Sequence, residues 1–100
     1  MTLEIRYGEN AVTGILAGRL DTVAAVQFAK DIEALTENAD KKILLDCSQL
    51  EFISSSGLRL FLTLRKATLA KGGKVVVKGI SKEIKKVFTI TGFSSLFDFE

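Results

Sequence analysis

The stretch KILLDCSQLEFISSSGL, residues 42–58, decides the fold of this chain. It begins with a continuous apolar run, Ile43-Leu44-Leu45, between two charged residues. Such a run is typical of a strand that is covered on both faces in a parallel sheet, so we expect helices to flank it. Three serines, residues 54–56, then lead into a predicted helix. In parallel sheets function gathers at the carboxyl ends of the strands, which draws attention to these serines.

Downstream of the serines, hydrophobic periodicity predicts two helices and a strand. The first helix runs from Gly57 to Ala70, and its polar stripe is so narrow that most of the helix should be buried. A buried strand follows at residues 75–77, and then a short helix between Ser81 and Gly92. The last eight residues are too apolar for a free tail, and their large side chains should pack on the sheet: Phe93, Leu96, Phe97 and Phe99.

Upstream, the chain begins with a predicted β-hairpin. Apolar and polar residues alternate over residues 3–7, residues 8–10 supply the turn, and residues 11–17 form the second strand. Asp21 or Thr22 can cap a helix that ends at residues 38–40, with an apolar face at helical spacing: Ala25, Phe28, Ala29, Ile32 and Leu35. The order ββαβαβα predicts an α/β fold with a mixed sheet and right-handed crossovers.

Composition narrows the chemistry. The 100 residues include 47% hydrophobic side chains, no histidine and a single cysteine, Cys47. This length suits one domain, so residues 1–100 are assigned to it. Without histidine, catalytic triads, Cys-His pairs and HExxH zinc sites are excluded. Cys47 is predicted to be a small buried packing residue, which fits a reducing compartment.

No targeting segment is apparent in the sequence. The first residues lack the basic and then apolar pattern of a signal peptide. No apolar run approaches the roughly 18 residues that span a bilayer. We therefore expect a cytoplasmic protein without membrane insertion.

Charge is unevenly distributed, although the net charge is only +2. Residues 1–56 hold five Lys/Arg against nine Asp/Glu, residues 57–86 nine against one, and residues 87–100 none against two. The simplest interpretation is that the middle segment carries solvated lysines. The alternative is a nucleic-acid surface between Arg59 and Lys86, but such surfaces normally come with a higher isoelectric point or a recognisable module. We expect no nucleic-acid partner.

Three groups of residues could carry chemistry, and each has a simpler explanation. The serines at 54–56 lack both the Gly-x-Ser-x-Gly elbow and a Ser-x-x-Lys pair. Residues 71–74, KGGK, resemble the end of a phosphate loop, but Thr68 stands where its first glycine belongs, so a turn is predicted. The carboxylates of Asp21, Asp46 and Glu51 lack the spacing of a calcium loop. We expect a protein that is not an enzyme and holds no metal and no cofactor.

Motifs along nearly the whole chain resemble those of a STAS domain of the anti-sigma factor antagonist family. In chain order they are GRLD at 18–21, LLDCS at 44–48, FISSSGL at 52–58, KGGKV at 71–75, GIS at 79–81 and TGF at 91–93. Their joint order and spacing carry the resemblance. It implies a single STAS-like α/β domain, whose mixed β-sheet consists of an N-terminal hairpin and parallel strands and is flanked by helices.

The resemblance further implies a binding protein that is switched by phosphorylation. In that family the segment usually reads Asp-Ser-Ser/Thr-Gly-Leu, and a serine kinase that is also the anti-sigma factor phosphorylates its first serine. On this sequence the acceptor is Ser55, with Ser54 and Ser56 as alternatives, and Ser54 stands in place of the family's Asp. A phosphate at a helix N-terminus should leave the fold intact, and a PP2C-type phosphatase would remove it.

Unmodified, such a protein would bind the kinase and release a sigma factor, and we expect it to be a monomer when free. Ser54, Ser56 and Gly57 would shape the loop, with Arg59 and Thr63 as outward partner contacts. Asp21 is expected to be a helix cap in preference to a contact. The alternative is a STAS scaffold that is not phosphorylated, as an accessory subunit of a transporter or a stress-signalling assembly, and Ser54 favours it.

Overall fold

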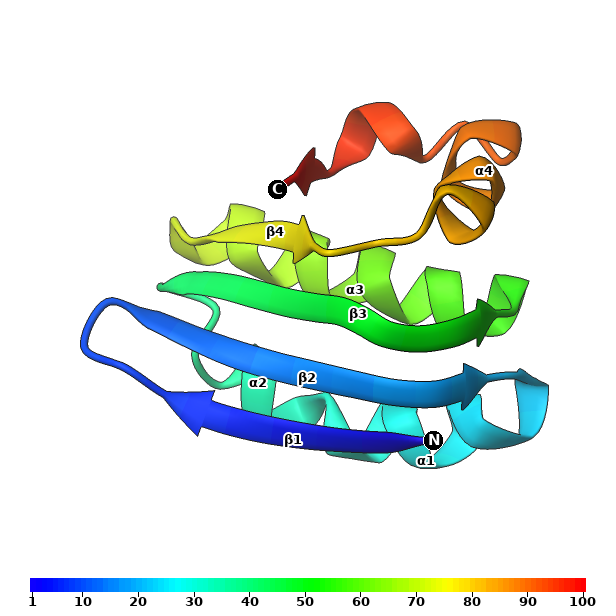
Figure 1. Cartoon of the computed structure of the whole chain (residues 1–100). Coiled ribbons are helices and arrows are strands. Elements are labelled where there is room, and N and C mark those ends of the chain that lie inside the picture. The colour runs from blue at the N-terminus through cyan, green and yellow to red at the C-terminus, as the bar shows by residue number, and fades with distance from the viewer.

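The computed structural model describes residues 1–100 as one five-stranded sheet with helices on one side (Figure 1). The strands lie side by side in chain order, β1 against β2 antiparallel and the rest parallel. They are β1 (Thr2–Tyr7), β2 (Ala11–Leu20), β3 (Lys42–Ile53), β4 (Lys74–Lys78) and β5 (Asp98–Phe99). The helices are α1 (Thr22–Asp31), α2 (Glu33–Thr36), α3 (Ser55–Lys71) and α4 (Lys82–Ile90), with a 3-10 turn at Ser94–Leu96.

The expectation of helices on both faces of the central strand is wrong. In Figure 1 α1, α2 and α3 lie behind the sheet, and no helix lies over the face toward the viewer. Ile43 and Leu45 of β3 are fully buried beneath the helices, whereas Leu44 between them is half-buried on the open face. A short apolar run indicates that a strand is central, but it does not reveal what covers each face.

β3 is longer than its apolar run because it continues through residues 46–53 beside β2. Two register shifts between β2 and β3 let the twelve residues of β3 run beside the ten of β2. Bulges of this kind insert extra residues into one strand of a pair. As a result Ile53 ends level with Leu20, and the residues after both strands meet at one edge of the sheet.

The helices differ from their predicted limits. The helix predicted to follow Asp21 and to end at residues 38–40 is divided at Ile32 into α1 and α2. α3 begins two residues earlier than predicted, at Ser55, and it is less buried than its narrow polar stripe suggested, because Leu69 is exposed. Its buried polar residue, Thr68, satisfies its hydroxyl by donating to Arg65 O (2.7 Å). No helix is both long enough and apolar enough to cross a membrane.

The C-terminal phenylalanines pack on the sheet as predicted and also extend it. Asp98 and Phe99 form β5 and pair with Val76 and Val77 of β4. Phe97 is buried, and its ring lies 5.6 Å from that of Phe88 in α4, centroid to centroid. The tail therefore closes the core at the fifth-strand edge, and this short strand was not predicted.

Candidate functional site

β2 and β3 end side by side, and both lead directly into a helix. Leu20 pairs with Ile53, and Ser54 N donates a hydrogen bond to Leu20 O (2.8 Å). α1 and α3 therefore begin next to each other at the carboxyl edge of the parallel strands, the usual position of functional loops in such sheets. We call residues 54–57 the serine segment.

A separate side chain caps each of these two helices. Asp21 Oδ1 accepts a hydrogen bond from Ala24 N (2.8 Å) at the start of α1. Ser54 Oγ accepts one from Gly57 N (3.2 Å) at the start of α3. Both residues have extended backbones, as N-cap residues do. The prediction that Asp21 is a helix cap is confirmed, and the structure adds that Ser54 is the cap of α3.

Ser54 thus does the structural work of a capping residue at the position where the family usually has Asp. Ser and Asp are nearly equivalent as N-caps, since each offers an oxygen to the first free amides of the helix. The exchange therefore preserves the geometry of the serine segment. What it removes is one negative charge beside the expected acceptor.

Ser55 is the first residue of α3 and its side chain is exposed. Its hydroxyl makes no hydrogen bond within the chain, because the cap bond belongs to Ser54. The backbone amides of Ser55 and Ser56 also have no partner within the chain. Two free amides and the positive end of a seventeen-residue helix face the solvent here, an arrangement that stabilises negative charge. Ser56 is half-buried and less accessible.

Gly57 allows the start of α3 to lie close against β2. A Cβ atom on Gly57 would lie 2.5 Å from Leu20 Cγ and 2.8 Å from Leu20 Cδ2, well inside van der Waals contact. Leu20 is fully buried and cannot swing away into solvent. The absence of a side chain at Gly57 therefore sets the distance between the helix and the strand.

We predict that Gly57→Ala lowers the free energy of unfolding by about 1–3 kcal/mol, because the added methyl group overpacks the contact with Leu20. Urea denaturation of the purified variant measures the loss. The matched control is Ser55→Ala in the same helical turn, which removes an exposed, unbonded hydroxyl and should change stability by no more than about 0.5 kcal/mol. Equal stability of the two variants would contradict the close approach.

Arg59 and Thr63 lie where the sequence placed them, on the exposed side of α3. Residues four apart on a helix are surface neighbours, so Ser55, Arg59 and Thr63 form one line along the helix. Thr63 Oγ1 donates to Arg59 O (3.0 Å), and the guanidinium of Arg59 has no ion-pair partner within the chain. The serine segment and this line are continuous and make up one surface.

Three exposed residues at the same edge were missed by the sequence analysis. The guanidinium carbon of Arg19 lies 4.4 Å from the ring centroid of Phe52, which is 38% exposed. On α1, Val23 is 82% exposed and Val26 is 66% exposed. Phe52 is exposed directly after Glu51 because of the register shift between β2 and β3, which no local sequence pattern indicates. The two valines carry no signal either, because isolated apolar residues are common on surfaces.

Cys47 is a buried packing residue, as predicted. Its side chain belongs to the main core cluster and is 1% exposed. Burial, together with the nearby carboxylate of Asp46, raises the pKa of the Cys47 thiol to about 12. The thiol is therefore protonated and shielded at neutral pH, so it is unsuited to be a nucleophile or a metal ligand.

The carboxylates of Asp21, Asp46 and Glu51 do not form a cluster that could hold a metal ion. Asp21 is committed to its cap. Asp46 accepts hydrogen bonds from Ser48 Oγ (2.7 Å) and Ser48 N (3.0 Å), and these, with Lys78 nearby, hold the pKa of Asp46 below its usual value. Both aspartates thus have local structural partners.

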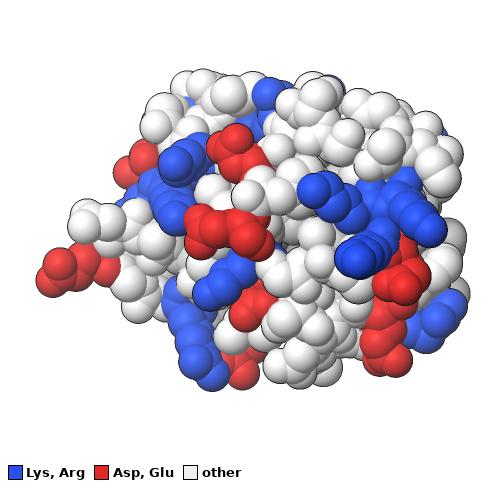
Figure 2. Space-filling view, turned by 45° about the horizontal axis from the view of Figure 1, so that its top comes forward, with Lys and Arg blue, Asp and Glu red and all other residues white.

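On the side of the molecule that Figure 2 shows, Lys and Arg side chains do not form a surface of one sign. Figure 2 shows Asp and Glu side chains lying between the Lys and Arg side chains on this side of the molecule. Lys78 of β4 lies opposite Asp46 of β3 in the strand register. Lys42 Nζ, which belongs to the acidic half of the sequence, forms an ion pair with Glu100 Oε2 (3.6 Å). This interleaving favours the interpretation of the lysines as solvated surface residues over a nucleic-acid footprint.

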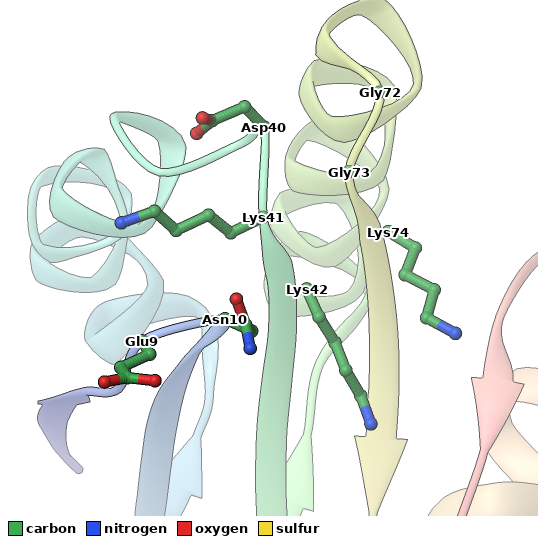
Figure 3. Close-up of a pocket in the computed structure, with 8 residues that line it drawn as sticks. All are labelled: Glu9, Asn10, Asp40, Lys41, Lys42, Gly72, Gly73 and Lys74. Carbon is green, nitrogen blue, oxygen red and sulfur yellow. The ribbon is translucent and has the colours of Figure 1, made fainter.

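The largest hollow, of about 470 Å³, lies at the opposite end of the sheet (Figure 3). It includes Gly72 and Gly73 of the KGGK turn, where Gly72 ends α3 with a left-handed backbone (φ 83°). A Cβ on Gly73 would overlap the carbonyl oxygens of Ala39 and Lys41. The charged ends of Lys41, Lys42 and Lys74 point away from one another in Figure 3, so they do not form a phosphate cradle. The prediction of a helix-to-strand turn is confirmed.

Comparison with known proteins places this geometry in a family. The family model described as "STAS domain" matches residues 8–100. The chain is 30% identical over 97 residues to a Bordetella bronchiseptica protein named "Putative anti-sigma factor antagonist BtrV". The match covers 97% of this chain and 84% of BtrV.

Two solved structures of the Bacillus protein SpoIIAA share the fold. The unphosphorylated form of this anti-sigma factor antagonist superposes with a TM-score of 0.80 at 22% identity, covering 99% of this chain and 88% of SpoIIAA. The phosphorylated form gives a TM-score of 0.74 at 23% identity, covering 99% and 91%. At these identities the superpositions establish a common fold. The family match and the relative in Bordetella show that the chain belongs to the STAS domain family, among the anti-sigma factor antagonists.

Proposed function

We propose that this protein is a phosphorylation-controlled binding protein and not an enzyme. In its unmodified form it binds a serine kinase of the anti-sigma type in the cytoplasm, and a sigma factor is thereby released. The observation that carries the proposal is the state of Ser55. Its hydroxyl is exposed and free of hydrogen bonds at the start of α3, while the capping bond is supplied by Ser54.

The proposed contact surface runs from the serine segment along the outer side of α3. Ser55, Arg59 and Thr63 follow one another at four-residue spacing and are all exposed. Phe52 is exposed near the end of the strand that leads into the serine segment, where it contacts Arg19. Aromatic and arginine side chains are both enriched in protein–protein contact surfaces.

Phosphorylation would transfer the terminal phosphoryl group of ATP to Ser55 Oγ and add about −1.5 to −2 charges at neutral pH. The free amides of Ser55 and Ser56 and the dipole of α3 would stabilise that charge within this chain. Arg59 is one helical turn away and lies within reach of the phosphate. The fold would therefore persist, and only the contact surface would change.

A PP2C-type phosphatase would return the protein to its binding form. The phosphate would sit on an exposed residue at the edge of the sheet, where a second enzyme can reach it without unfolding the chain. Two enzymes acting on one hydroxyl are sufficient for a reversible switch.

Intact-mass spectrometry tests the proposal. Each serine kinase of the anti-sigma type encoded in the same genome is incubated with this protein and ATP. We expect one kinase to add a single phosphoryl group to the native chain and to Ser56→Ala, but none to Ser55→Ala. Thr89→Ala, at an exposed hydroxyl on α4 outside the proposed contact surface, is the control and should still be modified.

A scaffold that is never phosphorylated is the second candidate, because Ser54 stands where the family's Asp is usual. If no kinase modifies residues 54–56 while one of them still binds the chain tightly, the scaffold function replaces the proposed one. The equivalence of Ser and Asp as caps weighs against this, since the serine segment keeps its geometry.

A further inference from the structure

The outer edge of β1 has no partner strand within the chain. β1 is the first strand of the sheet and pairs only with β2. The unpaired N–H and C=O groups of an edge strand are a template for another strand. Natural edges are commonly protected by charged side chains, especially Lys, or by Pro; β1, with the sequence TLEIRY, has no Lys or Pro, and its two charges, Glu4 and Arg6, are of opposite sign.

The register of the hairpin shows which backbone groups face outward. Gly8 N donates to Ala11 O (2.9 Å), so this pair is of the hydrogen-bonded type. Hydrogen-bonded and non-hydrogen-bonded pairs alternate along an antiparallel ladder. The even-numbered residues of β1 therefore bond to β2, and the N–H and C=O groups of Leu3, Ile5 and Tyr7 point away from the sheet.

The side chains of β1 also suit a copy of the same strand. In an antiparallel pair centred on Ile5, Glu4 of one chain lies opposite Arg6 of the other, and this occurs twice because of the two-fold symmetry. Leu3 then lies opposite Tyr7, whose side chain is 66% exposed in the single chain. Opposite charges and aromatic–aliphatic contacts are both favourable as cross-strand pairs.

The charges select this register over its neighbours. The next registers that keep the hydrogen bonds are shifted by two residues. A shift in one direction places Glu4 opposite Glu4 of the second chain, and a shift in the other places Arg6 opposite Arg6. Both bring like charges together. In the favoured register the outward groups of Leu3, Ile5 and Tyr7 all meet outward groups of the second chain. Hydrogen bonding and charge therefore agree on a single arrangement.

We propose that two copies of this chain associate through β1, antiparallel and centred on Ile5, to form a continuous ten-stranded sheet. The sequence led us to expect a monomer when free, and the self-complementary edge changes that expectation. Glu4 and Arg6 now pair within one chain (Arg6 Nε to Glu4 Oε2, 2.6 Å) and are well exposed, so they can exchange partners at little cost. The serine segment, beyond β3, stays outside this interface.

Sedimentation equilibrium at low salt, over a range of protein concentrations, tests the proposal. The average mass of the native chain should rise with concentration toward that of a dimer. Glu4→Lys and Arg6→Glu should each weaken association about tenfold or more, because both opposed pairs become like-charged, and 1.4 kcal/mol corresponds to a factor of ten.

An equimolar mixture of the two variants provides the decisive comparison. In the mixed pair the introduced lysine of one chain faces the introduced glutamate of the other, and the native Arg6 faces the native Glu4. Association should therefore return although neither variant associates alone. Glu37→Lys and Lys66→Glu reverse exposed charges elsewhere and should leave the self-association of the native chain unchanged. A native chain that stays monomeric at every concentration, or a mixture no heavier than its separate components, would overturn the proposal.

Discussion

Phosphorylated at Ser55, the protein is expected to bind the proposed anti-sigma kinase about 100-fold more weakly than the unmodified chain. A hydrated dianion at the centre of a contact surface must lose water when the partner binds, and it can repel acidic groups there. A penalty of about 3 kcal/mol is enough, since each 1.4 kcal/mol changes affinity tenfold. The loss should lie in binding alone, because the exposed hydroxyl has no structural bond to lose.

Isothermal titration calorimetry with the kinase measures the effect. Ser55→Asp carries one negative charge where the phosphate carries nearly two, and it should weaken binding by about tenfold. Ser55→Ala should bind within about twofold of the native chain. Asn10→Asp adds the same charge in the turn between β1 and β2, at the far end of the sheet, and should change nothing. Equal affinities for Ser55→Ala and Ser55→Asp would exclude Ser55 as the switch.

Phe61→Ala is expected to lower the free energy of unfolding by about 3–5 kcal/mol, the usual cost of removing a buried phenylalanine. Phe61 is fully buried, and its ring centroid lies 6.1 Å from that of Phe28, 6.0 Å from Phe88 and 6.4 Å from Phe97. The ring thus joins α3 to α1, to α4 and to the C-terminal tail. Its loss leaves a cavity among three elements that cannot all close around it.

Denaturation in urea measures this loss, which is a large fraction of the roughly 5–15 kcal/mol that typically stabilises a domain. The matched control is Phe52→Ala, where the ring is 38% exposed and contacts Arg19 at the surface. That change should cost about 1 kcal/mol or less, because an exposed cation–π contact contributes about 0.5–1 kcal/mol. Similar losses for the two variants would mean that the aromatic cluster does not hold the helices together.

Local patterns in the sequence predicted the features that depend on near neighbours. The alternation at residues 3–7 indicated the first strand, Asp21 was placed as a cap, and KGGK was interpreted as a turn, and all three are confirmed. Each depends on backbone conformation and residues a few positions away. The apolar runs at residues 43–45 and 75–77 and the order ββαβαβα predicted the parallel strands correctly, because a strand–helix–strand connection brings the second strand parallel to the first.

What could not be predicted depends on partners distant in sequence. The bulges that lengthen β3 arise from its pairing with β2. Leu44 is only half-buried because no helix covers its face of the sheet. β5 has only two residues, too few for an alternation to be visible. Within the site, the sequence could place Ser55 close to the start of a helix. It could not show that Ser54, by accepting a hydrogen bond from Gly57 N, is the residue that caps α3.

Ser54 caps α3 while the hydroxyl of Ser55 makes no hydrogen bond, and this difference affects the lifetime of the protein in the cell. Proteases act mainly on transiently opened chains, so their rate depends on the stability of the fold. Because the cap bond of α3 does not involve the Ser55 hydroxyl that we propose as the phosphate acceptor, the protein should resist proteolysis equally well with and without the phosphate. An inactive pool could then be kept and returned to use by hydrolysis of one phosphoester, with no need for new synthesis.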